Sequence, residues 1–125
     1  MNTTTLTVQS CGNGKFRLGV NTNDSSTIFQ KRYRKVVLKI EKNRVIDTET
    51  TCGPPNDKEV LKNKKCKKGY DLYAKKIDQW IKSNHFHCYR ERQPTKIEFQ
   101  IIKSNSTIIL KFTGNTRNNR CKCYN

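Results

Sequence analysis

The sequence has 125 residues and a formal net charge of +16, with 33% hydrophobic and 29% charged residues. A chain of this size and composition suits one domain with a modest core, and it has no apolar stretch long enough to cross a bilayer. The excess of positive charge is matched by an acidic partner or tolerated as repulsion within the protein. Six cysteines in so short a chain favour a disulfide framework and hence a secreted, extracellular protein.

Other features of the sequence fit secretion. Asn-x-Ser/Thr sequons begin at Asn2, Asn23 and Asn105, as in a glycoprotein. The first ten residues lack the basic start and apolar run of a signal peptide. We therefore interpret the sequence as a mature segment with an added Met1.

Residues 1–30 show no long periodic run, and a turn-rich cluster surrounds Cys11. We expect an irregular N-terminal arm here, with Ile28 and Phe29 docking it on the core. The next segment is rich in β-branched residues with partial alternation, which predicts a strand over about 35–41 and a second near 44–49.

The stretch 71–83 has the apolar spacing of a short amphipathic helix. Asp71 is expected as its N-cap and Asn84 as its C-cap. Trp80 is expected to be the main contact between this helix and the sheet. The residues predicted to share the buried face are Tyr73, Ala74, Ile77, Trp80 and Ile81.

The remaining segments read as short strands and turns. A short strand is expected over 59–61. The two apolar runs 96–102 and 107–112 predict a β-hairpin, followed by a turn at Gly114 and an edge strand over 120–124.

Together these elements predict an α+β fold. Its small antiparallel sheet, of three strands or more, carries one helix packed across it and is stapled by disulfides. The chain is interpreted as a single domain over 1–125. Within it, 1–30 is the arm, 31–84 the sheet with the helix, and 85–125 a C-terminal hairpin extension.

Basic residues gather in two clusters: residues 31–35 have the basic-basic-x-basic arrangement typical of heparin sites, and five lysines crowd around Cys66. Sulfates bind Arg through paired N–H donors and Lys as a point charge. We expect charge reversal at Arg32 and Arg34 to weaken heparin binding more than the same change at Lys39 and Lys42. The predicted glycosaminoglycan-binding residues are Lys31, Arg32, Arg34, Lys35, Lys62, Lys64, Lys65, Lys67 and Lys68.

The other group of residues that could take part in metal binding or catalysis is His85, His87 and Cys88. Their spacing differs from that of ordinary structural zinc sites, so we predict no metal and no cofactor. A small secreted ribonuclease would need a general base and a general acid on opposite sides of a phosphate, which two histidines two residues apart do not supply. We therefore expect no enzymatic activity, and ribonuclease remains the third functional alternative.

The central stretch resembles the chemokine family. Cys52 and Cys66 are placed like the third and fourth chemokine cysteines, Glu59-Val60-Leu61-Lys62 like the second strand, and Tyr73 follows Cys66 by seven residues. The resemblance covers about residues 11–84. It implies an irregular arm, a three-stranded antiparallel sheet and a C-terminal helix.

The resemblance also implies a disulfide pairing. Cys11 would pair with Cys52 or Cys66. The tail would be tied by Cys88, with Cys121 or Cys123 as its partner.

The function implied is that of a secreted chemokine-like ligand, which binds a cell-surface receptor and sulfated glycosaminoglycan through its basic face. The alternative is a secreted basic effector of a different fold that binds a polyanion or another partner, in a host-modulating or antimicrobial role.

Overall fold

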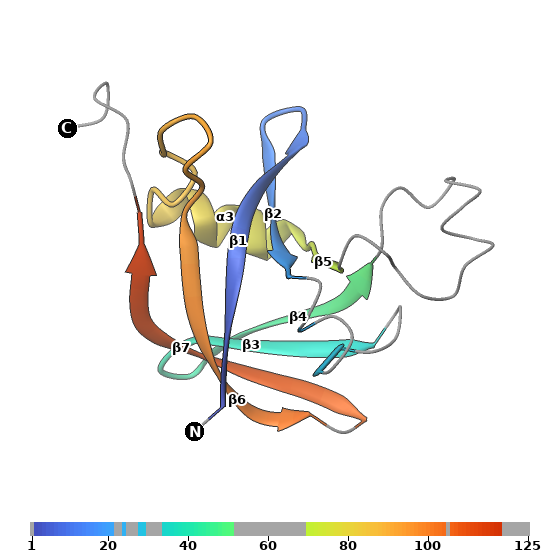
Figure 1. The fold of residues 1–125 in the computed structure, drawn as a ribbon. Helices are drawn as coiled ribbons and strands as arrows, with labels where there is room; N and C mark the ends of the chain where they lie inside the picture. The colour runs from blue at the N-terminus through green and yellow to red at the C-terminus, as the bar shows by residue number, and fades with distance from the viewer. Residues whose placement is uncertain are drawn as a thin grey trace.

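The structure is a computed structural model that describes residues 2–21, 24, 28–29, 34–51, 70–104 and 106–118. It is built mainly from strands, with one short helix in the described part of the chain (Figure 1). The elements are β1 (Thr3–Gly12), β2 (Lys15–Val20), β3 (Lys35–Glu41), β4 (Arg44–Thr51), β5 (Asp71–Leu72), α3 (Lys75–Ser83), β6 (Lys96–Ser104) and β7 (Thr107–Arg117).

The strands form a closed barrel in the order β1-β2-β5-β4-β3-β7-β6. Neighbours are antiparallel except β3 and β7, which are parallel. β1, β2 and the first part of β6 stand nearly upright in Figure 1, and β3 and β4 lie nearly across them. β6 and β7 bend from one direction into the other, and their pairing shifts register at two places. Such irregularities bend strands, so they let the sheet close on itself.

The core fills the barrel with residues that alternate along each strand. In β3, Val36, Leu38 and Ile40 are buried and the residues between them point outward. Trp80, on α3, is 1% exposed and makes edge-on contacts with Phe86 and Phe112, both at 5.4 Å between ring centroids. The helix therefore covers the barrel through its aromatic contacts.

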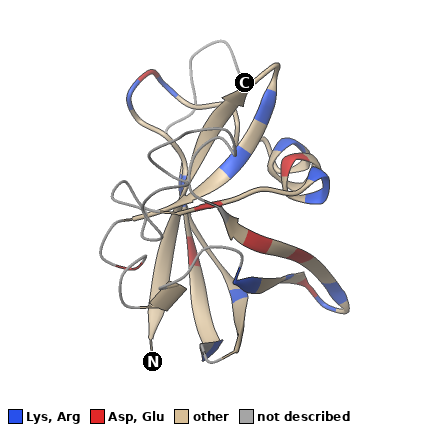
Figure 2. Cartoon of the chain, turned by 90° about the vertical axis from the view of Figure 1, so that its right-hand side faces the viewer, with Lys and Arg blue, Asp and Glu red and all other residues tan. Residues whose placement is uncertain are grey.

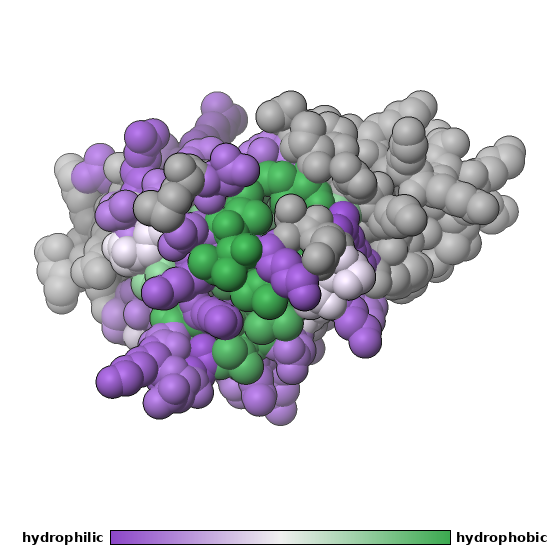
Figure 3. Space-filling view, turned by 90° about the horizontal axis from the view of Figure 1, so that it is seen from below, coloured by the Kyte–Doolittle hydropathy of each residue, from purple (hydrophilic) through white to green (hydrophobic). Residues whose placement is uncertain are grey.

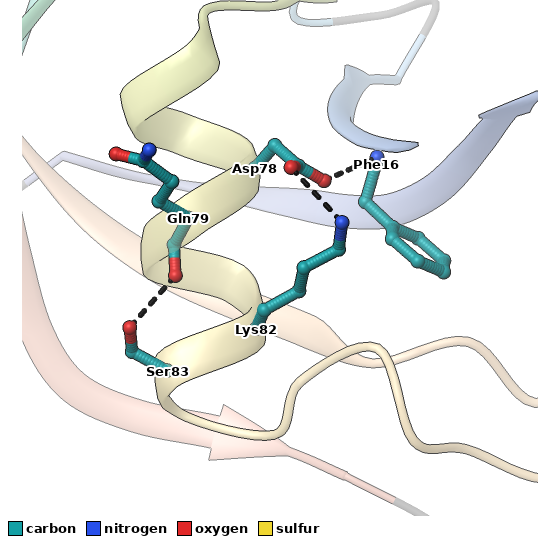
Figure 4. Close-up of polar contacts among 5 residues, drawn as sticks. All are labelled: Phe16, Asp78, Gln79, Lys82 and Ser83. Carbon is teal, nitrogen blue, oxygen red and sulfur yellow. Dashed lines mark hydrogen bonds and ion pairs between the residues drawn. The ribbon is translucent and has the colours of Figure 1, made fainter. Parts of the chain in front are cut away.

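Asp78 fixes α3 to the β1–β2 hairpin (Figure 4). Its Oδ1 accepts the backbone N–H of Phe16 at 2.9 Å, and its Oδ2 accepts from Lys82 Nζ at 3.1 Å. Asp78 is 8% exposed, so this carboxylate is a buried polar group whose partners satisfy it.

The barrel shows that the predicted α+β fold and the chemokine resemblance are wrong. A chemokine-like sheet has three antiparallel strands under one helix, whereas here residues 3–20 and 96–117 supply strands of the same barrel as 35–51. The expected irregular arm is instead the hairpin of β1 and β2. The C-terminal hairpin exists as predicted, but it is built into the barrel: β6 pairs with β1, and β7 with β3.

The predicted disulfide framework is also not found in the described residues. Cys11 is an exposed free cysteine and Cys88 a half-buried one. Cys52, Cys66, Cys121 and Cys123 lie outside the described residues, as do the strands expected over 59–61 and 120–124.

The predicted start of the helix is wrong as well. Asp71 lies in β5, and the helix begins at Lys75 after Ala74, which makes no side-chain cap hydrogen bond. Asp71 instead forms an ion pair with Arg17 at 3.3 Å. Burial raises the pKa of the Asp71 carboxyl, and the Arg17 guanidinium opposes that rise.

Other local predictions are confirmed. The strands near 35–41 and 44–49 are β3 and β4, Asn84 is the C-cap, and Phe29 is fully buried. Near Gly114, where a turn was expected, the chain stays in β7 and the pairing with β6 shifts register.

Candidate functional site: a lysine-framed face of the barrel

Arg34 and Lys35 are the predicted glycosaminoglycan-binding residues that fall within the described part of the chain. Arg34 is half-buried, and its Nη1 donates to the carbonyl of Ile28 at 3.1 Å. Lys35 is exposed at the start of β3. The basic run is therefore divided at this point, because the Arg34 side chain, just before β3, is held against the carbonyl of Ile28, whereas Lys35 is exposed.

The other predicted binding residues lie outside the described residues, and their role stays a prediction. They are Lys31, Arg32, Lys62, Lys64, Lys65, Lys67 and Lys68. Among the described residues, Lys and Arg are spread over strands and helix with Asp and Glu among them (Figure 2).

Lysines from distant parts of the sequence meet on the outer surface of β3, β6 and β7, together with apolar side chains that point outward from these strands and from the start of β4. We call this surface the lysine-framed face. Figure 3, seen from below, shows an apolar stripe bordered by polar residues on the side where these strands lie. The residues of the lysine-framed face are Lys35, Val37, Lys39, Val45, Ile102, Lys103, Ile109 and Lys111.

Strand register fixes the arrangement of the face. In the parallel β3–β7 pair, Lys39 lies opposite Lys111 and Val37 opposite Ile109. On the β6 side, Lys103 lies opposite Ile109. Neighbouring strands are about 4.8 Å apart, so the apolar pair has lysines as neighbours along β3 and β7 and on β6, and Asp47 opposite Val37 on β4.

The four lysines of the face are exposed, and none forms an ion pair with a residue in the described part of the chain. Like charges placed directly opposite each other on a sheet are destabilising, so the Lys39–Lys111 pair opposes folding. Within the described residues, Arg17, Arg44 and Lys82 have carboxylate partners, and other exposed lysines such as Lys75 and Lys76 have none, so what sets the face apart is the direct Lys39–Lys111 register. The lysine-framed face is therefore a place where an anion would relieve repulsion.

Acidic residues limit the face on the side of β4. Asp47 lies opposite Val37, and Glu49 lies opposite Lys35. A groove of about 440 Å³ follows this border. Its lining is of mixed charge, so the positive part of the face is the part over β3, β7 and β6.

A second groove, of about 380 Å³, lies over β6 and β7. Lys96 and Arg117 face each other across this strand pair. Glu98 also lines the groove and accepts from Asn115 Nδ2 at 3.2 Å. The carboxylate reduces the positive charge here, which makes this groove the weaker anion site.

The histidines lie just after the helix. His87 Nε2 is 3.6 Å from Cys88 Sγ, and its ring packs against Phe16 at 5.5 Å between centroids. Burial lowers the pKa of His87, and the nearby charges of His85 and Lys82 lower it further, while Asp78 opposes this. Within the described residues, no group of three or more His, Cys, Asp or Glu is placed to hold a metal ion.

The binding residues predicted from the sequence include Lys35 but not Lys39, Lys103 or Lys111. Lys39 lies outside the predicted binding cluster, because single lysines in alternating strands give no local charge run. Their alternation with buried apolar residues was the available signal, since it placed them on the outer surface. The sequence alone does not give the strand order that brings these lysines together.

Comparison with known proteins gives no match, whether to a protein family, a curated protein or a solved structure. In the described residues there is no helix of the length and apolar character needed to span a membrane.

Proposed function

We propose that this protein binds polyanions outside the cell, with sulfated glycosaminoglycans as the ligand class, and that the four lysines of the lysine-framed face are the site. The observation that carries the proposal is the Lys39–Lys111 pair, two exposed lysines in direct register on adjacent strands. The net charge of +16 supports it, because it attracts polyanions from a distance. The proposed function is binding and involves no catalytic step.

The physical basis is the release of counterions. A sulfate group seated between two ammonium groups displaces the small ions that both partners hold in solution, so affinity falls as salt rises. It also cancels the repulsion between Lys39 and Lys111. Lys35 and Lys103 extend the positive area along β3 and onto β6, which suits a chain carrying several sulfates rather than one small anion.

The test is the affinity of the full chain for a fluorescent heparin oligosaccharide, measured by anisotropy over a series of NaCl concentrations. The variant Lys39→Glu with Lys111→Glu should bind much more weakly. Its slope of log affinity against log salt should be smaller by about two, one for each lost contact.

The matched control is Lys75→Glu with Lys76→Glu. These lysines are exposed in the first turn of α3, where acidic residues suit the helix dipole, and the change in net charge is the same. The control should lose little affinity and keep the slope. Equal losses from the two double variants would show diffuse attraction by net charge and would overturn the proposed site.

A further inference from the structure

The lysine-framed face has an apolar centre that the binding of sulfates does not use. Ile102 is 48% exposed and Val45 is 47% exposed, and these are among the largest exposures of apolar side chains in the described residues. Val37 and Ile109 are half-buried, directly opposite each other, and lie on the two strands between those of Val45 and Ile102, while Val45 itself lies opposite Lys39. A sulfated glycan would leave these aliphatic groups in water.

In the middle of this centre, at Val37 and Ile109, the backbone is already paired on both sides. β3 is hydrogen-bonded to β4 on one side and to β7 on the other, and β7 is also paired with β6. A peptide strand cannot add to the middle of such a sheet, so contacts there come from side chains alone. The groove along β3 and β4 is lined mostly by polar and charged residues, with Val36 and Val37 among them, and the groove over β6 and β7 is lined by polar and charged residues, which disfavours an apolar helix as their occupant.

The face has an aliphatic centre framed by lysines and no apolar groove. A partner that fits it is a flat surface with anionic groups at its exterior and an apolar layer beneath them. We propose that the lysine-framed face docks on bilayers rich in anionic phospholipid. Lys39, Lys103 and Lys111 contact the headgroups, and Ile102 with Ile109 enters the boundary with the acyl chains. This inference rests on the proposed function, because it uses the same lysines.

The chemistry of lysine supports this placement. A lysine has a long apolar stem that can lie along aliphatic neighbours while its ammonium reaches the phosphates. Asp47 and Glu49, on the β4 side, would be repelled by an anionic surface. They therefore limit the contact to the part of the face over β3, β7 and β6.

The experiment is sedimentation of the full chain with vesicles of phosphatidylcholine alone or of phosphatidylcholine mixed with phosphatidylserine. The protein should bind the mixed vesicles and not the neutral ones. Ile102→Thr should lower the partition coefficient about fivefold, through lost apolar burial, while leaving heparin affinity unchanged. The double variant Lys39→Glu with Lys111→Glu should lower binding both to the mixed vesicles and to heparin.

Tyr73→Ser is the matched control, because Tyr73 is 38% exposed and lies between β5 and α3, outside the face. Melting temperatures of all variants verify that they are folded. The inference is overturned if mixed vesicles are not bound, if neutral vesicles are bound equally, or if Tyr73→Ser costs as much as Ile102→Thr. If the protein binds heparin but not the mixed vesicles, the face binds glycans alone. If the wild-type chain binds the mixed vesicles but does not bind heparin, the proposed glycan ligand is refuted instead.

Discussion

Replacing Trp80 with alanine should remove a large part of the stability of the barrel. Trp80 is 1% exposed and is among the largest fully buried side chains. Truncation of a buried Trp costs about 3–5 kcal/mol, because apolar burial is lost and a cavity remains. Besides its contacts with Phe86 and Phe112, the indole packs against Phe99 at 6.1 Å. Such aromatic pairs add about 0.5–1.5 kcal/mol each beyond burial, so the upper part of the range is expected.

The measurement is equilibrium unfolding in urea followed by far-ultraviolet circular dichroism. Against a typical total of about 5–15 kcal/mol, the expected loss should shift the midpoint strongly. The control is Tyr73→Ala, an aromatic truncation just before the same helix. Tyr73 is 38% exposed, so its loss should change the free energy of unfolding by about 0.5 kcal/mol or less.

Fluorescence gives an independent check, because Trp80 is the single tryptophan of the chain. Acrylamide should quench the folded protein weakly and the urea-unfolded protein strongly. If Trp80→Ala and Tyr73→Ala lose equal stability, or if the folded protein is quenched as readily as the unfolded one, the packing of α3 described above is wrong.

Two further predictions concern the polar groups around α3. Asp78→Ala should cost about 2 kcal/mol, because it leaves the part-buried N–H of Phe16 without its acceptor and removes the ion pair with Lys82. Asp78→Asn keeps an acceptor for Phe16 and should cost about 1 kcal/mol or less, and equal losses in urea would contradict the role of that hydrogen bond. The pKa of His87 is lower in the folded protein than its ordinary value of 6.5. Below that pH the unfolded chain therefore binds more protons than the folded chain, so the stability present above pH 6.5 is lost on acidification. The melting temperature should therefore fall less for His87→Gln than for the wild type between about pH 7 and pH 5, and parallel curves would contradict the assignment.

The sequence predicted those elements whose signals are local. Alternation of buried and outward residues identified β3 and the β6–β7 hairpin, because each strand has a buried face. β1 was missed although Thr4, Leu6 and Val8 alternate in the same way, and all three are buried. Threonine suits strands because its side chain is β-branched, and its hydroxyl made the segment look like a polar loop.

The start of the helix was mispredicted because a tertiary contact overrides a local preference. An aspartate before an apolar helical pattern is a good N-cap candidate. Here Leu72, next to Asp71, is fully buried, and the two residues pair with β2 on one side and with β4 on the other. The carboxylate of Asp71 is then held by Arg17, a partner that the sequence alone does not identify.

The lysine-framed face illustrates the same limit for function. Its lysines are contributed by strands far apart in the sequence, and the parallel pairing of β3 with β7 sets Lys39 beside Lys111. A search for runs of basic residues selects Arg34 with Lys35, which the fold separates, and passes over single lysines that the sheet unites. The buried partners on the same strands, Leu38 and Leu110, hold the register that places these charges together. Burial of those leucines therefore offsets the repulsion on the outer surface, and a bound polyanion would remove that repulsion without any change of the fold.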